Sequence, residues 1–194
     1  QPVITKWNLS RFAECLIPLI DKAQDTAIKS ATEIIDTFEK TYEEKWLNMM
    51  RNKLGLLGTD EKDKYLILDL LTWMHQNKVD YTNTFCYLMN FKIQENNIYE
   101  DNNFSNWKKR WERRLLKNDS TKKKCIELMR NNNPLVVPRN QKIEEALKNA
   151  NKGNLKPFNR LLKVLNKPYI EQGDITNYQV PSKFSEKYKT FCGT

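Results

Sequence analysis

An apolar stripe that repeats every three to four residues between Gln24 and Leu54 is the strongest constraint on how this chain folds. Such spacing puts apolar side chains on one face of an α-helix, whose period is 3.6 residues. The pattern predicts one long helix, ended by Gly55 in the left-handed conformation that closes many helices. The stripe consists of Ala27, Ala31, Ile34, Ile35, Phe38, Tyr42, Trp46, Met49 and Met50.

The same period recurs along the rest of the sequence and predicts an all-α, mostly helical fold without a sheet. Trp7, Phe12, Leu16 and Leu19 indicate a short first helix with Pro18 near its end. Polar residues that cap helices mark the later starts. Further helices are expected after Thr59 or Asp60 through Met74, after Asp80 through Met89, after Ser105, after Ser120, at about Gln141–Ala150 and at about Leu155–Leu165.

Three segments lack this period and are expected to be irregular. Residues 90–103 are polar and rich in asparagine, which favours a surface loop. Pro134 and Pro138 predict an extended segment over residues 131–140, because proline is excluded from helix interiors. From Pro168 onward we expect a tail that wraps the surface.

Glycine is scarce, at 5 of 194 residues, against a usual share of about 7%. Phosphate-binding loops and tight sheet turns consume glycine, so the scarcity argues against a complete nucleotide-binding α/β enzyme. It fits a helical protein or a piece of a larger one, and the first residue, Gln1, is expected to follow processing or a cut. The longest apolar run, Cys15 to Ile20, is far shorter than the ~20 residues of a membrane helix.

Charge is concentrated in the second half of the chain. The whole sequence has a net charge of +9, whereas residues 104–194 hold 21 basic and 8 acidic side chains, a net charge of +13. This asymmetry suits an acidic or nucleic-acid partner. It equally suits a C-terminal layer that docks on an acidic remainder of the same chain.

Side chains that could carry catalysis are few. His75 is the single histidine and so the one candidate for a catalytic triad, but no serine or cysteine nucleophile signature lies near it. The pairs Glu43/Glu44 and Glu144/Glu145 are adjacent, so on a helix they diverge by about 100° and do not converge on a substrate. We therefore interpret these residues as structural or surface positions.

The stretch from Trp107 to Arg114 mixes basic and aromatic residues, a combination that can bind phosphates and stack on bases. On a helix, however, Trp107, Trp111 and Leu115 share one face. We favour the interpretation that this face is a core stripe, and keep a nucleic-acid-binding module as the alternative.

The four cysteines are scattered and form no CxxC motif, so a zinc ribbon or a thioredoxin-like site is excluded. Cys15, Cys86 and Cys125 are expected to be reduced thiols. Cys192 lies third from the end, where a terminal tail makes its thiol chemically available.

Several segments together resemble the selenoprotein O (SelO, formerly UPF0061) family. Each is moderately specific, and their occurrence in the same order makes the resemblance strong over essentially the whole chain. They are Gln1–Phe12 (QPVITKWNLSRF), Asp80–Phe85 (DYTNTF), Asn133–Ala146 (NPLVVPRNQKIEEA), Gly153–Phe158 (GNLKPF), Leu161–Tyr169 (LLKVLNKPY) and Tyr188–Thr194 (YKTFCGT).

The resemblance implies a protein-kinase-like fold that binds ATP in a flipped orientation. Such proteins transfer AMP, with Mg²⁺ or Mn²⁺, to Ser, Thr or Tyr hydroxyls of protein substrates. Full-length members are more than twice this long, and their catalytic, nucleotide-binding and metal-binding residues precede the segment that matches Gln1–Phe12. The resemblance therefore assigns no catalytic, cofactor or metal residue to this chain, which we expect to be inactive alone and to bind no ATP or metal by itself.

Under this resemblance, residues 1–130 are the helical remainder of a kinase-like C-lobe and residues 131–194 are a C-terminal extension. The family's terminal cysteine or selenocysteine matches Cys192, which implies a redox role with a partner cysteine upstream of Gln1. The implied partners are the upstream kinase-like portion and protein substrates, without a membrane or nucleic acid. The implied location is the bacterial cytoplasm, or the mitochondrion for a eukaryotic member. A non-catalytic interaction domain remains a further alternative.

Overall fold

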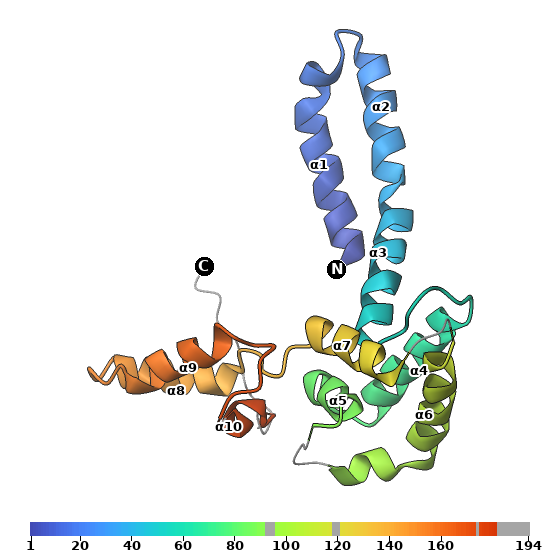
Figure 1. The fold of residues 1–194 in the computed structure, drawn as a ribbon. Coiled ribbons are helices and arrows are strands. Elements are labelled where there is room, and N and C mark those ends of the chain that lie inside the picture. Colours follow the sequence, from blue (N-terminus) through green and yellow to red (C-terminus); the bar gives the residue numbers. More distant parts are fainter. Residues whose placement is uncertain (92–95, 118–120, 174, 182–194) are drawn as a thin grey trace. The chain divides into compact units, whose positions relative to one another are not determined.

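A computed structural model describes residues 1–91, 96–117, 121–173 and 175–181 of the chain. Within these ranges all regular elements are helices and no strand occurs, which confirms the all-α prediction (Figure 1). The chain forms two compact units, Gln1–Met50 and Arg51–Thr194. The boundary between residues 130 and 131 that the resemblance implies stays a prediction.

The first unit is a helical hairpin. Helix α1 (Pro2–Ile20) and helix α2 (Gln24–Asp36) run antiparallel and in contact, and helix α3 (Phe38–Lys53) continues from α2 and ends in the second unit (Figure 1). Pro18 lies inside α1, two residues before its end, as expected. The buried side chains of α2 are Ala27 and Ala31, small residues that let the two helices approach.

The single helix expected from Gln24 to Leu54 is wrong in one respect, because it is interrupted at Thr37. The Thr37 hydroxyl donates to the Ile34 carbonyl at 2.7 Å, and the Thr37 N–H donates to the same oxygen at 3.1 Å. A threonine side chain that bonds to the preceding turn competes with the regular helix pattern. The interruption is therefore local, and α3 begins at the next residue.

The second unit contains the remaining elements. They are α4 (Asp63–Gln76), α5 (Tyr81–Leu88), the 3₁₀ helix η1 (Asn96–Glu100), α6 (Asn102–Leu115), α7 (Lys122–Asn132), α8 (Asn140–Ala150), α9 (Lys156–Leu165) and α10 (Thr176–Gln179). Its core is aromatic: Phe85, Phe104, Trp107 and Trp111 are all at least 95% buried. The Trp107 and Trp111 rings stack with centroids 5.9 Å apart, and α6 contacts α4.

The predicted cap of α5 is confirmed, and those of α4 and α6 are corrected. Asp80 caps α5 by accepting a hydrogen bond from the Asn83 N–H at 2.9 Å, as predicted. Thr59 or Asp60 as the cap of α4 is wrong, because α4 begins only at Asp63.

Ser105 as the cap of α6 is also wrong. Asp101 takes that role and accepts from the Phe104 N–H at 3.0 Å, so α6 begins earlier than predicted. Helix α7 is capped by Thr121, and Ser120 lies outside the described residues. The predicted loop over 90–103 contains η1 and the start of α6, whereas residues 133–139 are irregular as predicted.

Candidate functional site

Two of the segments that carry the family resemblance meet in the second unit, at a cluster that we call the polar junction (Asp80, Asn83, Arg139 and Gln179). Asp80 starts α5, Arg139 precedes α8, and Gln179 ends α10. The guanidinium of Arg139 donates through Nη1 to Oδ2 of Asp80, and through Nη2 to Oδ1 at 3.0 Å. Both side chains are mostly buried, with 13% and 16% of their surface exposed. A bidentate pair in this setting fixes the relative orientation of its two segments.

The polar junction also fixes the last described part of the chain. The carbonyl oxygen of Gln179 accepts from Nη2 of Arg139 at 3.1 Å and from Nδ2 of Asn83 at 3.2 Å. The Gln179 side chain in turn donates to the Leu135 carbonyl at 3.0 Å. Helix α10 is thereby held against the start of α5 and the segment before α8.

The thiol of Cys86 lies near the polar junction but is not activated as a nucleophile. Burial raises the pKa of the Cys86 thiol to about 11, and the nearby Asp80 charge acts in the same direction. The thiol is therefore protonated near neutral pH, and it donates weakly to the Pro134 carbonyl at 3.9 Å. Burial lowers the pKa of Lys53, whose ammonium lies 4.7 Å from the centre of the Phe85 ring. This arrangement orients helices rather than performing acid–base chemistry.

A second charged cluster lies where α3, α4 and α6 meet. The carboxylate of Asp63 is fully buried and accepts from Nε of Arg51 at 2.7 Å and from Nε of Arg114 at 2.7 Å. Nη2 of Arg114 and the Asp60 N–H also donate to Asp63, at 3.1 and 3.0 Å. Arg114 reaches the carbonyls of Leu57 and Gly58 as well, so this cluster closes the loop between α3 and α4.

Some of the basic side chains of residues 104–194 form ion pairs within the same chain. Four of its cations bind carboxylates from earlier in the chain: Arg110 binds Asp69, Arg114 binds Asp63, Lys117 binds Asp60 and Arg139 binds Asp80. They support the interpretation that a basic C-terminal layer docks on acidic positions of the same chain.

The tryptophans of the mixed basic and aromatic stretch are confirmed as core residues. Trp107 and Trp111 are 2% and 4% exposed, and their indole N–H groups donate to the carbonyls of Leu66 and Leu54, each at 2.8 Å. Side chains held in this way do not stack on nucleic-acid bases. These two tryptophans therefore do not support the nucleic-acid alternative.

The other residues considered from the sequence are separate from one another. His75 is exposed, as are both members of each adjacent glutamate pair, Glu43/Glu44 and Glu144/Glu145. Cys15 is an exposed free thiol, whereas Cys86 and Cys125 are buried free thiols. Cys192, the one residue with an expected functional role, lies outside the described residues. In the described part of the chain, no three His, Cys, Asp or Glu side chains group so as to hold a metal ion.

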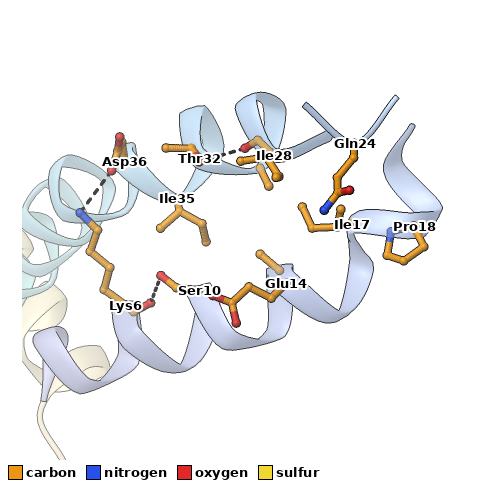
Figure 2. A pocket seen from close by; sticks show the side chains of 12 residues that line it. Lys6, Ser10, Glu14, Ile17, Pro18, Gln24, Ile28, Thr32, Ile35 and Asp36 are labelled. Carbon is orange, nitrogen blue, oxygen red and sulfur yellow. Dashed lines mark hydrogen bonds and ion pairs between the residues drawn. The ribbon is translucent and has the colours of Figure 1, made fainter. Parts of the chain in front are cut away.

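The first unit carries a groove of about 620 Å³ between α1 and α2 (Figure 2). One end is polar: Nζ of Lys6 lies 3.5 Å from Asp36 and 3.3 Å from Glu39, and the hydrogen bond to Glu39 raises the pKa of Lys6. The other end is lined by Ile17, Pro18, Ile28 and the polar Gln24. Because the charged groups at the polar end already pair with one another, the groove is better suited to packing than to catalysis.

Sequence reasoning missed the polar junction and the Asp63 cluster as units. It found Asp80 as a cap and Arg114 as part of the mixed basic and aromatic stretch, but it did not predict their ionic partners. The available signal was that residues 80–85 and 133–146 both carry the family resemblance. Oppositely charged residues that belong to two such motifs are candidates for an ion pair with each other.

The sequence model of the family described as "Protein adenylyltransferase SelO" matches residues 1–166. The chain therefore belongs to the SelO family, a family of nucleotidyltransferases. The match ends before Cys192.

Individual relatives extend over the whole chain. The "Protein nucleotidyltransferase YdiU" of Pelagibacter ubique is 54% identical over 195 aligned residues, which is 100% of this chain and 40% of the relative. Proteins with the same name from Alcanivorax borkumensis and Clostridium perfringens are 43% and 40% identical, again over 100% of this chain. The chain thus spans about 40% of the length of these relatives. Among the described residues, no helix is both long enough and apolar enough to cross a membrane.

Proposed function

We propose that this chain is part of a protein adenylyltransferase that transfers AMP from ATP to Ser, Thr or Tyr hydroxyls of proteins. One observation carries the proposal: the family description names protein adenylyltransferase, and it matches residues 1–166. The relatives' shared name, protein nucleotidyltransferase, supports the broader class. The proposed location is the bacterial cytoplasm.

In the proposed reaction a protein hydroxyl oxygen attacks the α-phosphorus of ATP. The bond from that phosphorus to the bridging oxygen of pyrophosphate breaks, AMP stays on the protein, and the hydroxyl proton passes to a base. Mg²⁺ or Mn²⁺ would neutralise charge on the triphosphate. As the family resemblance implies, we assign the metal, the nucleotide and the catalytic groups to the part of the longer protein that precedes the segment matching Gln1–Phe12.

This chain is proposed to supply the helical scaffold. The Asp63 cluster and the polar junction tie helices from separate parts of the sequence into one unit. Rigid supporting elements of this kind keep catalytic groups in position. Residues 1–194 alone are accordingly expected to transfer no AMP.

The tail is proposed to add redox control through Cys192. A low-molecular-weight disulfide is the oxidant: the Cys192 thiolate attacks it and releases one half as a thiol. A second protein thiol then displaces the other half and forms the protein disulfide, so two protein thiols lose two electrons in total. We place the second thiol in the longer protein, as the family resemblance implies.

Separate incubations of the longer protein with ATP labelled at the α-phosphate or at the γ-phosphate test the proposed reaction. AMP transfer places the α-label on protein and leaves the γ-label in pyrophosphate. Residues 1–194 alone serve as the inactive control. Retention of the γ-label would instead mean phosphate transfer, and retention of neither label would favour the non-catalytic interaction domain.

A further inference from the structure

A pocket of about 440 Å³ lies between α8, α9 and α10. All three helices belong to the second unit, and α8 packs against α9 (Figure 1). The volume falls within the range of about 300–1,000 Å³ that is typical of small-molecule sites. We call it the basic pocket and define it by six of its lining residues: Lys142, Ala146, Lys156, Arg160, Leu161 and Tyr178.

The lining of the basic pocket is positively charged. Lys142 comes from α8, whereas Lys156 and Arg160 are four residues apart on α9 and therefore lie on one side of that helix. The one carboxylate in the lining is Glu145, whose Oε2 lies 3.4 Å from Nζ of Lys142. Glu145 is 57% exposed, and ion pairs this open to water are weak. Three cations against one carboxylate favour an anionic ligand.

Two of these cations lie where helix electrostatics disfavours them. Lys142 is the third residue of α8, and Lys156 is the first residue of α9. The N-terminal end of a helix carries partial positive charge, so acidic side chains are preferred there. Neither first turn contains an acidic residue. Where a sequence breaks a local rule in this way, a functional site is a common reason, and a bound anion would offset the repulsion.

The basic pocket also has an apolar part. Ala146 and Leu161 are buried residues of its lining, and the half-buried Tyr178 adds an aromatic side chain from α10. Tyr178 directly precedes Gln179, whose carbonyl accepts from Arg139 in the polar junction, so α10 is held in place by bonds outside the pocket. Inorganic phosphate alone would leave this apolar surface unused, whereas a phosphate with an organic body would cover it.

We propose that the basic pocket binds a small organic phosphate. Its phosphate group pairs with Lys156 and Arg160, in the field of Lys142, because ammonium and guanidinium groups bind phosphate through charge-assisted hydrogen bonds. Its organic part lies against Leu161 and Tyr178. This site is separate from that of the substrate ATP, which stays assigned to the preceding part of the longer protein, and it does not depend on which group the enzyme transfers.

Lysine acetylation of the longer protein under native conditions, followed by mass spectrometry, locates the ligand. The probe is AMP without ATP or metal, so that no transfer reaction occurs, and adenosine is the matched compound without a phosphate. AMP at about 10 mM should slow acetylation of Lys156 about fivefold by occupying the pocket. Lys163 is exposed on the same helix and does not line the pocket, so its rate should not change.

Arg160→Glu and Lys163→Glu form a matched pair, because they change the net charge equally. Arg160→Glu should raise the AMP concentration that half-protects Lys156 by about tenfold or more, the loss expected for one charge-assisted hydrogen bond. Lys163→Glu should change it less than about twofold, because exposed charges outside the site are screened. An unchanged AMP concentration in Arg160→Glu would contradict the proposal.

The unsubstituted protein also tests the proposal without any variant. Absence of Lys156 protection by AMP would overturn it. Equal protection by adenosine would mean that the pocket does not recognise phosphate, and equal protection by inorganic phosphate would mean that it does not recognise an organic body. Protection by polyglutamate but not by AMP would assign the pocket to an acidic polypeptide instead. AMP transfer is measured separately, so this proposal and the proposed function can fail independently.

Discussion

At the scale of single residues, Asp63 is a buried carboxylate that joins two helices through ion pairs. It is fully buried and binds two guanidinium groups from different helices. A buried carboxylate is tolerated only when it is paired and hydrogen-bonded, and both conditions hold here. Removal of its charge would leave Arg51 and Arg114 close together without their common anion.

We expect Asp63→Asn to lower the free energy of unfolding by about 3–5 kcal/mol, because it breaks a buried ionic cluster from one side. Asp69→Asn is the matched control, since Asp69 also pairs with an arginine but both side chains are about half exposed. That change should cost less than about 1 kcal/mol. Urea unfolding followed by circular dichroism measures both. An equal loss of unfolding free energy in both variants would show that burial does not strengthen the ion pairs of Asp63.

The ionisation of Asp60 makes the stability of the fold depend on pH. A hydrogen bond from the Lys117 ammonium, with help from the Lys62 N–H, lowers the pKa of Asp60 to about 2 from its usual 3.8. A lowered carboxyl pKa in the folded state stabilises that state above the unfolded pKa, and the gain is lost as pH falls through the folded pKa. Asp60→Asn should therefore flatten the decline in melting temperature between about pH 4 and pH 2. A decline of the same slope as in the parent protein would contradict this assignment.

At the scale of elements, the end of α3 shows how a local signal becomes structure. The Leu56 N–H donates to the Arg51 carbonyl at 2.9 Å and the Gly55 N–H donates to the Asn52 carbonyl at 3.1 Å. This is the Schellman pattern, and it requires the left-handed conformation that Gly55 adopts at φ +70°. The prediction of Gly55 as the terminator is confirmed.

Gly55→Ala and Gly153→Ala form a matched pair, because both glycines have positive φ. A Cβ at Gly55 would lie 2.7 Å from the Cys125 carbonyl oxygen, whereas one at Gly153 would meet nothing within 4 Å. Gly153→Ala should cost about 1–2 kcal/mol from backbone strain alone. Gly55→Ala should cost a further 1–3 kcal/mol, roughly the penalty of overpacking. If thermal unfolding gives the same cost for both, the contact with α7 does not constrain the end of α3.

The polar junction can be tested by a double-mutant cycle. Asp80→Asn and Arg139→Gln each remove one charge of the bidentate pair that joins α5 to the segment before α8. The two changes should be non-additive by about 1–3 kcal/mol, as expected for partners in one buried network. A coupling below about 0.5 kcal/mol, measured by urea unfolding, would mean that the motifs meet without stabilising each other.

Sequence reasoning succeeded where the determining contacts are local and failed where they are not. The helical period, Gly55 and the Asp80 cap all depend on residues within one or two turns. The cap of α6 depends instead on a tertiary bond: Asp101 accepts the Trp73 indole N–H at 2.8 Å as well as the Phe104 N–H. Ser105 is an equally acceptable cap by residue type, so local rules could not select between them. Asp63 and Arg114 are likewise distant in the sequence.

At the scale of the whole molecule, the uneven charge has an intramolecular explanation in the second unit. Basic side chains from residues 104–194 bind carboxylates at Asp60, Asp63, Asp69 and Asp80. The burial of Trp107 and Trp111 means that these two side chains are not available to stack on nucleic-acid bases. The chain spans 40% of the length of its relatives. Both features are compatible with the proposed scaffold role.

The mass of the intact longer protein and of its substrates after incubation with ATP and Mg²⁺ tests this account most directly. The account predicts an added adenosine monophosphate group, mapped by fragmentation to a Ser, Thr or Tyr hydroxyl, and no such addition by residues 1–194 alone. Transfer of AMP by residues 1–194 alone would contradict it. An added phosphate, or no addition in the longer protein, would contradict it as well.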